Sequence, residues 1–193
     1  MNKRIRQKRV AIVKDAIKQI TSNKIVPEQW GYCTMTSIHY NDEDDFKSLL
    51  KSAKNEVCFV CALGSLLIAD VIKNNNCSVG QAQSSSYTYI AKRLANIFDN
   101  KILETLEYLF EMRSAGALYD ELYETFEADS AVLHSSKELR LYKLYILKLP
   151  ETPRERLLVL LRNIVRNDGE LVIPRDIVRQ YEKEHKKAVV SCA

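Results

Sequence analysis

An apolar stretch over residues 57–72 constrains this chain more than any other part of its sequence. Only Gly64, Ser65 and Asp70 interrupt it, so a helix formed here would be apolar on nearly every side. Such a helix must be surrounded by other elements, because apolar surface is driven out of water. We therefore expect a buried central helix from about Val57 to Ile72, with the rest of the chain packed around it.

The whole sequence is typical of a mainly α-helical, single-domain protein. Its 193 residues suit one domain, and only 5 Gly and 4 Pro punctuate them, which favours long helices. We expect a helical bundle over residues 1–193, with a basic helix in 1–24 and a charged helix and tail in 175–193. A small β element could instead form at 141–147 or at 170–173, and the sequence does not decide whether either segment is a strand.

Apolar residues at helical spacing predict several of these helices. They predict one at 4–22, a short one at 41–53, and others at 87–97, 100–110, 117–126 and 175–187. The clearest local signal is Thr152-Pro-Arg-Glu155, which combines a capping Thr, Pro at the first helical position and Glu at the third. It predicts a helix through Arg166 that ends at Asn167-Asp-Gly169.

Charge is distributed unevenly along the chain. Residues 1–24 carry eight Lys or Arg and one Asp, whereas residues 97–129 carry nine acids and two cations. Complementary charged helices can meet across a two-fold axis, so we expect a homo-oligomer, with a dimer as the first choice. The alternative is two solvated helix faces. The basic helix lacks interleaved aromatic residues and known motifs, which argues against nucleic acid as a partner.

The cysteine count and the N-terminus predict a cytoplasmic protein. Five cysteines are an odd number, and the N-terminus is charged and has no apolar signal segment. The apolar stretch over 57–72 is too short and too interrupted to span a bilayer. We therefore expect a soluble chain without a membrane association.

Cys58 and Cys61 form a Cys-x-x-Cys pair with three interpretations. Their apolar neighbours favour packing in the core, where a thiol behaves as a small apolar group. A nucleophilic thiol would need a base, for which His39 and His134 are the candidates. A zinc site would need a second ligand pair at comparable spacing, which the sequence lacks, so we expect no metal and no cofactor.

A ligand site is predicted from residue types that bind phosphate, ribose or bases. Arg162 and Arg166 are four residues apart and would share one helix face. Asn163 and Asn167 have the same spacing, and Arg93 is a further cation. Candidates for stacking on a base are Trp30, Tyr87 and Tyr89. The alternative is a basic helix face that pairs with the acidic segment 97–129.

Two motifs resemble those of a family of small phage and bacterial proteins. They are Cys61-Ala-Leu-Gly-Ser65 and Arg156-Leu-Leu-Val-Leu-Leu-Arg-Asn-Ile-Val-Arg-Asn-Asp-Gly169, and residues 94–111 between them fit the pattern loosely. The resemblance covers the central and C-terminal two-thirds of the chain. It implies a phage anti-defence protein acting in the bacterial host cytoplasm, but no residue role transfers with it.

These observations give one leading hypothesis and two alternatives. The leading hypothesis is non-enzymatic binding and sequestration of a small, phosphate-bearing nucleotide immune signal, as by a molecular sponge. The first alternative is a hydrolase or transferase that uses Cys58 or Cys61. The second is a protein-binding inhibitor that acts through its charged helix faces.

Overall fold

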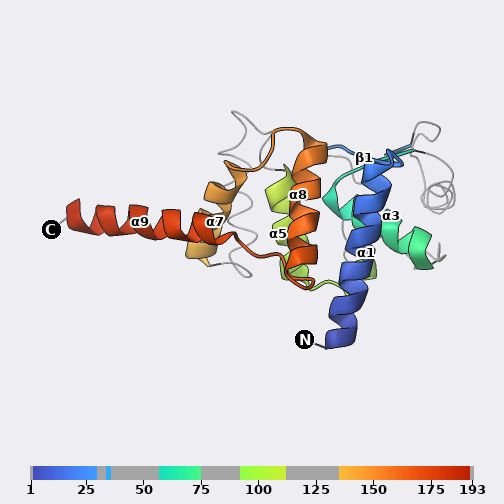
Figure 1. Cartoon of the computed structure of the whole chain (residues 1–193), viewed down its shortest axis with the longest axis horizontal. Helices are drawn as coiled ribbons and strands as arrows, with labels where there is room; N and C mark the ends of the chain where they lie inside the picture. Colours follow the sequence, from blue (N-terminus) through green and yellow to red (C-terminus); the bar gives the residue numbers. More distant parts are fainter. Residues whose placement is uncertain (1, 30–33, 36–56, 75–91, 112–134, 192–193) are drawn as a thin grey trace.

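The part of the chain that the structure describes is mainly α-helical, as the sequence predicts (Figure 1). The computed structural model describes residues 2–29, 34–35, 57–74, 92–111 and 135–191, and for 184–191 the backbone alone. Its helices are α1 (Lys3–Thr21), α3 (Ala62–Asn74), α5 (Asn100–Glu111), α7 (Ser136–Ile146), α8 (Pro153–Arg166) and α9 (Arg175–Ser191). A small sheet in the order β1-β3-β2 contains β1 (Ile25–Pro27), β2 (Thr34–Met35) and β3 (Cys58–Val60).

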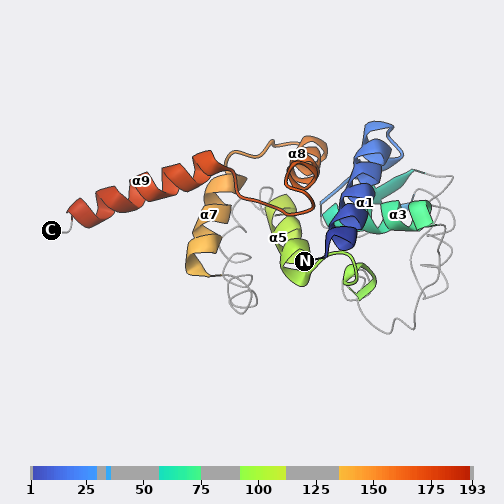
Figure 2. The same ribbon diagram turned by 60° about the horizontal axis from the view of Figure 1, so that its bottom comes forward.

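Among the described helices, four form a ring that is the body of this part of the fold. Helix α1 packs against α3 and α8, and α5 packs against the same two helices, so the four close a ring around the core. Figure 2 shows α1 and α8 side by side as one layer over α3 and α5. Helix α7 lies against α5, and α9 lies against α7 and carries the C-terminal end away from the body.

The central apolar stretch is not one helix, contrary to our expectation of a helix from Val57. Its first part is the strand β3, and α3 begins only at Ala62. Cys58 pairs with Ile25 of β1 in parallel and with Met35 of β2 in the antiparallel direction. The strand forms because partners on both sides satisfy its backbone groups. The prediction of burial is confirmed, since every residue of α3 from Ala62 to Val71 is buried.

The other predicted elements are largely confirmed where the structure describes them. Helices α1 and α8 lie where the sequence places them, while the predicted segments 41–53 and 117–126 lie outside the described residues. Segment 141–147 is not a strand, because a capping box of Ser135 and Glu138 starts α7. Residues 170–173 form no strand either. The helix predicted at 87–97 is described only from residue 92 and ends at Leu94.

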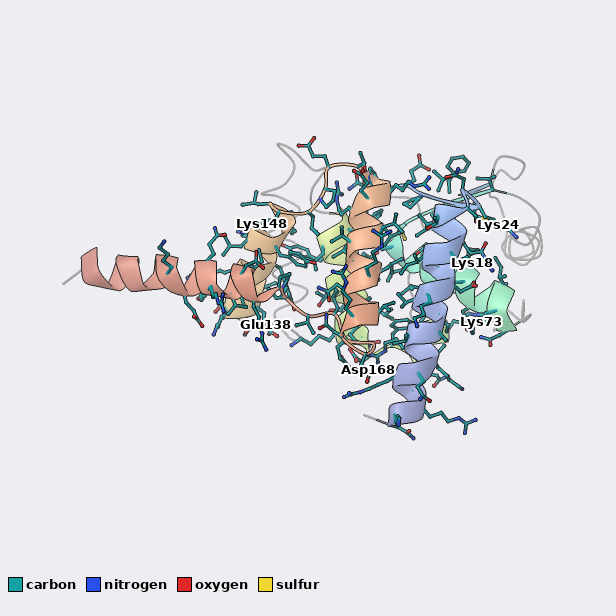
Figure 3. All side chains as sticks on the ribbon, viewed as in Figure 1. Lys18, Lys24, Lys73, Glu138, Lys148 and Asp168 are labelled. Carbon is teal, nitrogen blue, oxygen red and sulfur yellow. The ribbon has the colours of Figure 1, made fainter. Side chains whose placement is uncertain are left out.

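Helices α1 and α8 run antiparallel and are tied at both ends. At one end the Arg154 side chain donates to the Asn23 side chain and to the Thr21 carbonyl, at 3.4 Å. At the other end Arg6 Nη1 lies 3.6 Å from Asp168 Oδ2, beside the end of α8 (Figure 3). These contacts show the register of the two helices.

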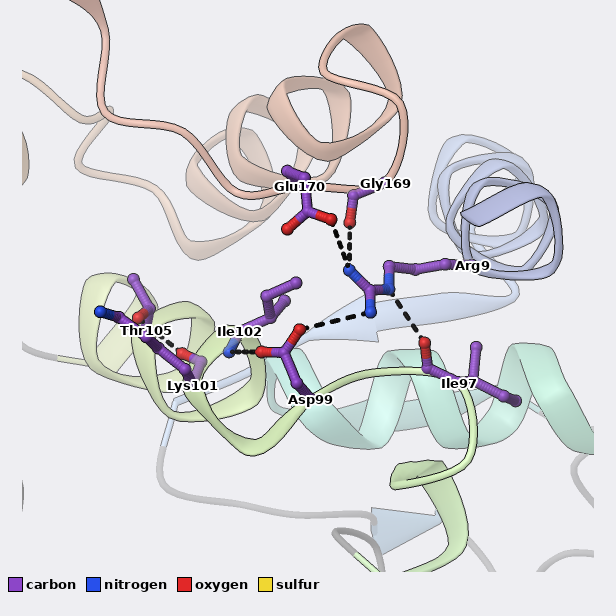
Figure 4. A network of polar contacts seen from close by, with 8 residues as sticks. All are labelled: Arg9, Ile97, Asp99, Lys101, Ile102, Thr105, Gly169 and Glu170. Atoms are coloured by element: carbon purple, nitrogen blue, oxygen red, sulfur yellow. Dashed lines mark hydrogen bonds and ion pairs between the residues drawn. The ribbon is translucent and has the colours of Figure 1, made fainter. Parts of the chain in front are cut away.

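The buried guanidinium of Arg9 joins α1 to two distant segments (Figure 4). Its side chain is 1% exposed. It donates to the carbonyl of Ile97 at 2.9 Å and to that of Gly169 at 2.8 Å. Its charge is balanced by Asp99 at 3.4 Å and by Glu170 at 3.3 Å. Arg9 therefore links α1 to the start of α5 and to the chain leaving α8.

We predict that Arg9→Met lowers the free energy of unfolding by about 3 kcal/mol, because the carbonyls of Ile97 and Gly169 lose a charged donor. Arg4→Met is the control, since Arg4 is exposed and its loss should change stability by about 0.5 kcal/mol or less. Urea denaturation of both variants measures the difference. Equal stability of the two variants would contradict the role given to Arg9.

We also predict a pH-dependent contribution from the Lys101–Glu138 ion pair, 2.6 Å long, which joins α5 to α7. Burial opposes the charged form of Glu138, but hydrogen bonds from Lys101 and Ser135 lower its pKa to about 2. Because the folded pKa lies below the unfolded value of about 4.3, the stabilisation is full above that value and lost as the pH falls toward 2. Glu138→Gln should therefore be less stable than the parent near neutral pH.

Thermal unfolding of both proteins at several pH values tests this, over the range in which both are folded. The difference between them should shrink as the pH falls from about 5 toward about 3. A difference that stays constant with pH would show that the ionised form of Glu138 contributes nothing.

Candidate functional site

The sequence of α8 presents one apolar face and one basic face. Thr152 Oγ1 accepts a hydrogen bond from the Glu155 amide at 3.3 Å, and Pro153 occupies the first turn, so the helix starts where the sequence predicts. Four of its apolar side chains turn into the core and are fully buried: Leu157, Leu160, Leu161 and Ile164. The opposite face of α8 is left to solvent.

Arg162 and Arg166 lie on that solvent face, as predicted. Both are exposed, and four residues along an α-helix separate them by about 6 Å. Neither guanidinium forms a hydrogen bond or ion pair with any residue that the structure describes. A guanidinium presents a planar fork of donors that matches two phosphate oxygens. The pair can therefore accept a phosphate-bearing ligand without first breaking a described contact.

The carboxylates closest in sequence to this face are engaged elsewhere. Glu155 Oε2 accepts from the Thr152 hydroxyl at 2.8 Å, and Asp168 pairs with Arg6. In the acidic segment, whose described part ends at residue 111, Asp99 pairs with Arg9. The predicted alternative, in which this segment neutralises the basic face of α8, finds no contact among the described residues.

Asn163 and Asn167 already have structural partners. The Asn163 side chain forms two hydrogen bonds with the backbone of Val172. Its Nδ2 donates to the Val172 carbonyl at 2.7 Å, and its Oδ1 accepts from the Val172 amide at 2.9 Å. The side-chain Nδ2 of Asn167 donates to the backbone carbonyl of Asn163 at 2.8 Å and to the Asn163 side-chain oxygen at 3.0 Å. These bonds hold the extended segment after α8, and they leave Asn163 little capacity for a ligand.

Arg93 balances a buried carboxylate on another helix. Its Nε lies 3.0 Å from Asp70 Oδ2, and Asn74 donates to the other oxygen at 2.5 Å. The side chains of Arg93 and Asp70 are 11% and 8% exposed. Asp70 belongs to α3, which the ring places across the core from α8. The structure therefore does not bring Arg93 together with Arg162 and Arg166.

Other predicted site residues lie outside the described residues. These are the stacking candidates Trp30, Tyr87 and Tyr89 and the two candidate bases, His39 and His134.

The two thiols of the Cys-x-x-Cys pair are buried. Cys58 is part of β3, and Cys61 precedes α3, where its Sγ accepts a hydrogen bond from the Gly64 amide at 3.4 Å. Burial raises the pKa of Cys61 to about 12, and the charges of Glu107 and Glu111 act in the same direction. A thiol is nucleophilic as its thiolate, so this environment suits a packing and capping role.

Two arginines in the described part of the chain are buried, which the sequence did not lead us to expect. Arg9 faces the core. Arg156 is also buried, and it donates to the carbonyls of Phe110 at 2.6 Å and Glu151 at 2.5 Å. The sequence contains a signal for Arg9, since Arg9 lies four residues before Val13 and seven before Ala16 and so shares one side of the helix with these apolar residues.

No group of three or more His, Cys, Asp or Glu side chains within the described ranges is arranged to hold a metal ion. Within the same ranges, no helix has the length and apolar character needed to cross a membrane. Comparisons of the chain with protein-family models, curated proteins and solved structures find no match.

We predict that Cys58 and Cys61 resist alkylation in the folded protein. With a pKa of about 12, only about one Cys61 thiol in ten thousand is ionised near pH 8. Iodoacetamide should modify both residues slowly in buffer and rapidly in urea, as peptide mass spectrometry can measure. Rapid modification of Cys61 in the folded protein would instead support a reactive thiol.

Proposed function

We propose that this protein binds a small, phosphate-bearing nucleotide signal and sequesters it without changing it chemically. The observation that carries the proposal is the exposed pair Arg162 and Arg166, which has no partner among the described residues. The resemblance to small phage proteins supplies the setting, in which removal of an immune signal would protect a phage from a host defence effector.

The contacts that hold α8 in place support a binding role for Arg162 and Arg166. The helix is capped by Thr152 and is tied to α1 through Arg154, while Asn163 fastens the chain that follows it. Binding sites on rigid elements lose less conformational entropy when a ligand arrives. The helix backbone therefore adds little ordering cost when Arg162 and Arg166 bind a ligand.

The thiols favour binding over thiol catalysis. An efficient thiol nucleophile has a lowered pKa, whereas burial raises the pKa of Cys61 to about 12. Cys58 is likewise buried. The proposal therefore assigns these residues to the core and the ligand to the exposed face of α8.

A depletion assay tests sequestration. We expect the purified protein, mixed with cyclic dinucleotides and cyclic ADP-ribose isomers, to remove at least one of them from an ultrafiltrate. Heating the retained fraction should release the same compound intact, as mass spectrometry can show. Release of an altered compound would indicate catalysis, and no depletion of any compound would contradict the proposed function.

We predict that the double substitution Arg162→Ala and Arg166→Ala weakens binding of the depleted compound at least about tenfold, because charge-assisted contacts to phosphate are lost. The matched control is Arg140→Ala with Arg179→Ala. Both of these arginines are exposed, on α7 and α9, and their removal changes the net charge equally. Equal binding by the two double variants would show that the site lies elsewhere.

A further inference from the structure

We propose that the phosphate site of α8 extends across the seam, the line along which α8 and α1 are in contact, to Lys14 as a third cation. The three cations then bind a diphosphate group in preference to a single phosphate. The inference rests on the proposed function in one respect, since it takes Arg162 and Arg166 as phosphate ligands.

The register of the two antiparallel helices places Lys14 beside Arg162. Arg6 lies against Asp168 near one end of the seam, and Arg154 reaches the Thr21 carbonyl near the other. Counting inward from either contact places Lys14 level with the turn of α8 that contains Arg162, because both helices rise by the same amount per residue.

The residues one turn before and after Lys14 and Arg162 show on which side of its helix each cation lies. Each cation is exposed and lies one helical turn from two half-buried apolar residues, one on either side. These neighbours are Val10 and Ile17 for Lys14, and Leu158 and Val165 for Arg162. Both cations therefore lie at the outer edge of the strip along which the two helices meet, in the layer that Figure 2 shows on one side of the body.

Lys14 is available to a ligand. It forms no hydrogen bond or ion pair with any residue in the described part of the chain. Asp15 is the only acid of α1, and it accepts a hydrogen bond from Gln19 at 3.5 Å. The positive charge of Lys14 is thus not balanced by a described contact.

The spacing and charge of the three cations fit two phosphates better than one. Arg162 and Arg166 are about 6 Å apart along α8, and the axes of packed helices are about 8–10 Å apart. Long, flexible side chains can converge from these positions. A nucleoside monophosphate carries about two negative charges near neutral pH, and a second phosphate adds about one more, which matches three cations.

Calorimetric titrations with inorganic phosphate, pyrophosphate, AMP and ADP test the preference. We expect pyrophosphate and ADP to bind about tenfold more tightly than phosphate and AMP, since a third cation is engaged. Tighter binding of ADP than of AMP, without tighter binding of pyrophosphate than of phosphate, would show that the diphosphate group alone does not carry the preference. That result, or equal affinity within both pairs, would overturn the inference.

Variants of Lys14 test its part directly. Lys14→Gln should weaken pyrophosphate binding about fivefold and phosphate binding less, whereas Lys14→Arg should retain the parent affinity. Lys73→Gln is the control, because Lys73 is exposed on α3, across α1 from α8 (Figure 3). Circular dichroism should show the same helix content in all variants. An equal effect of Lys14→Gln and Lys73→Gln would contradict the inference.

The two proposals fail separately. If pyrophosphate binds through Lys14 but no nucleotide signal is retained in the depletion assay, the proposed function is wrong and the diphosphate site stands. If a signal is retained and Lys14→Gln changes nothing, the function stands and the extended site is wrong.

Discussion

The buried guanidinium of Arg9 is the interaction on which the arrangement of the main helices depends. An arginine remains charged under all ordinary conditions, so its burial requires partners that are fixed in place. Those partners come from the segment before α5 and the segment after α8, as Figure 4 shows. In the observed register the guanidinium reaches the carbonyls of both Ile97 and Gly169, so these contacts favour that register of α1. Arg9 thereby sets the geometry of the surface above it.

The exposed side of α1 and α8 is the surface to which the proposed function assigns the ligand. The core side of α1 and α8 is closed by apolar packing and by Arg9, and the outer side carries cations without described partners, Lys14 from one helix and Arg162 and Arg166 from the other. A seam between two rigid helices can hold cations at fixed spacing, which a loop holds less well. The burial of Cys58 and Cys61 argues against thiol catalysis, and the exposed cations of the seam are suited to a phosphate-bearing compound.

The sequence predicts features that depend on neighbouring residues and misses those that depend on distant ones. Thr152 and Pro153 define the start of α8 locally, and Gly169, with φ of 91°, marks its end. The apolar segment at Cys58 has a composition that suits either a helix or a strand. It forms a strand because its backbone pairs with β1 on one side and with β2 on the other. The approach of Lys14 to α8 is a matter of helix register, which no local pattern contains.

The most direct test of the account is a nuclear magnetic resonance titration of isotopically labelled protein with inorganic pyrophosphate. A single phosphate site predicts that the backbone amide of Lys14 and the side-chain Nε–H signals of Arg162 and Arg166 shift together and report one dissociation constant, while the signal of Arg93 stays in place. Shifts concentrated at Arg93 and α3, or no shift at Lys14 and α8, would contradict it.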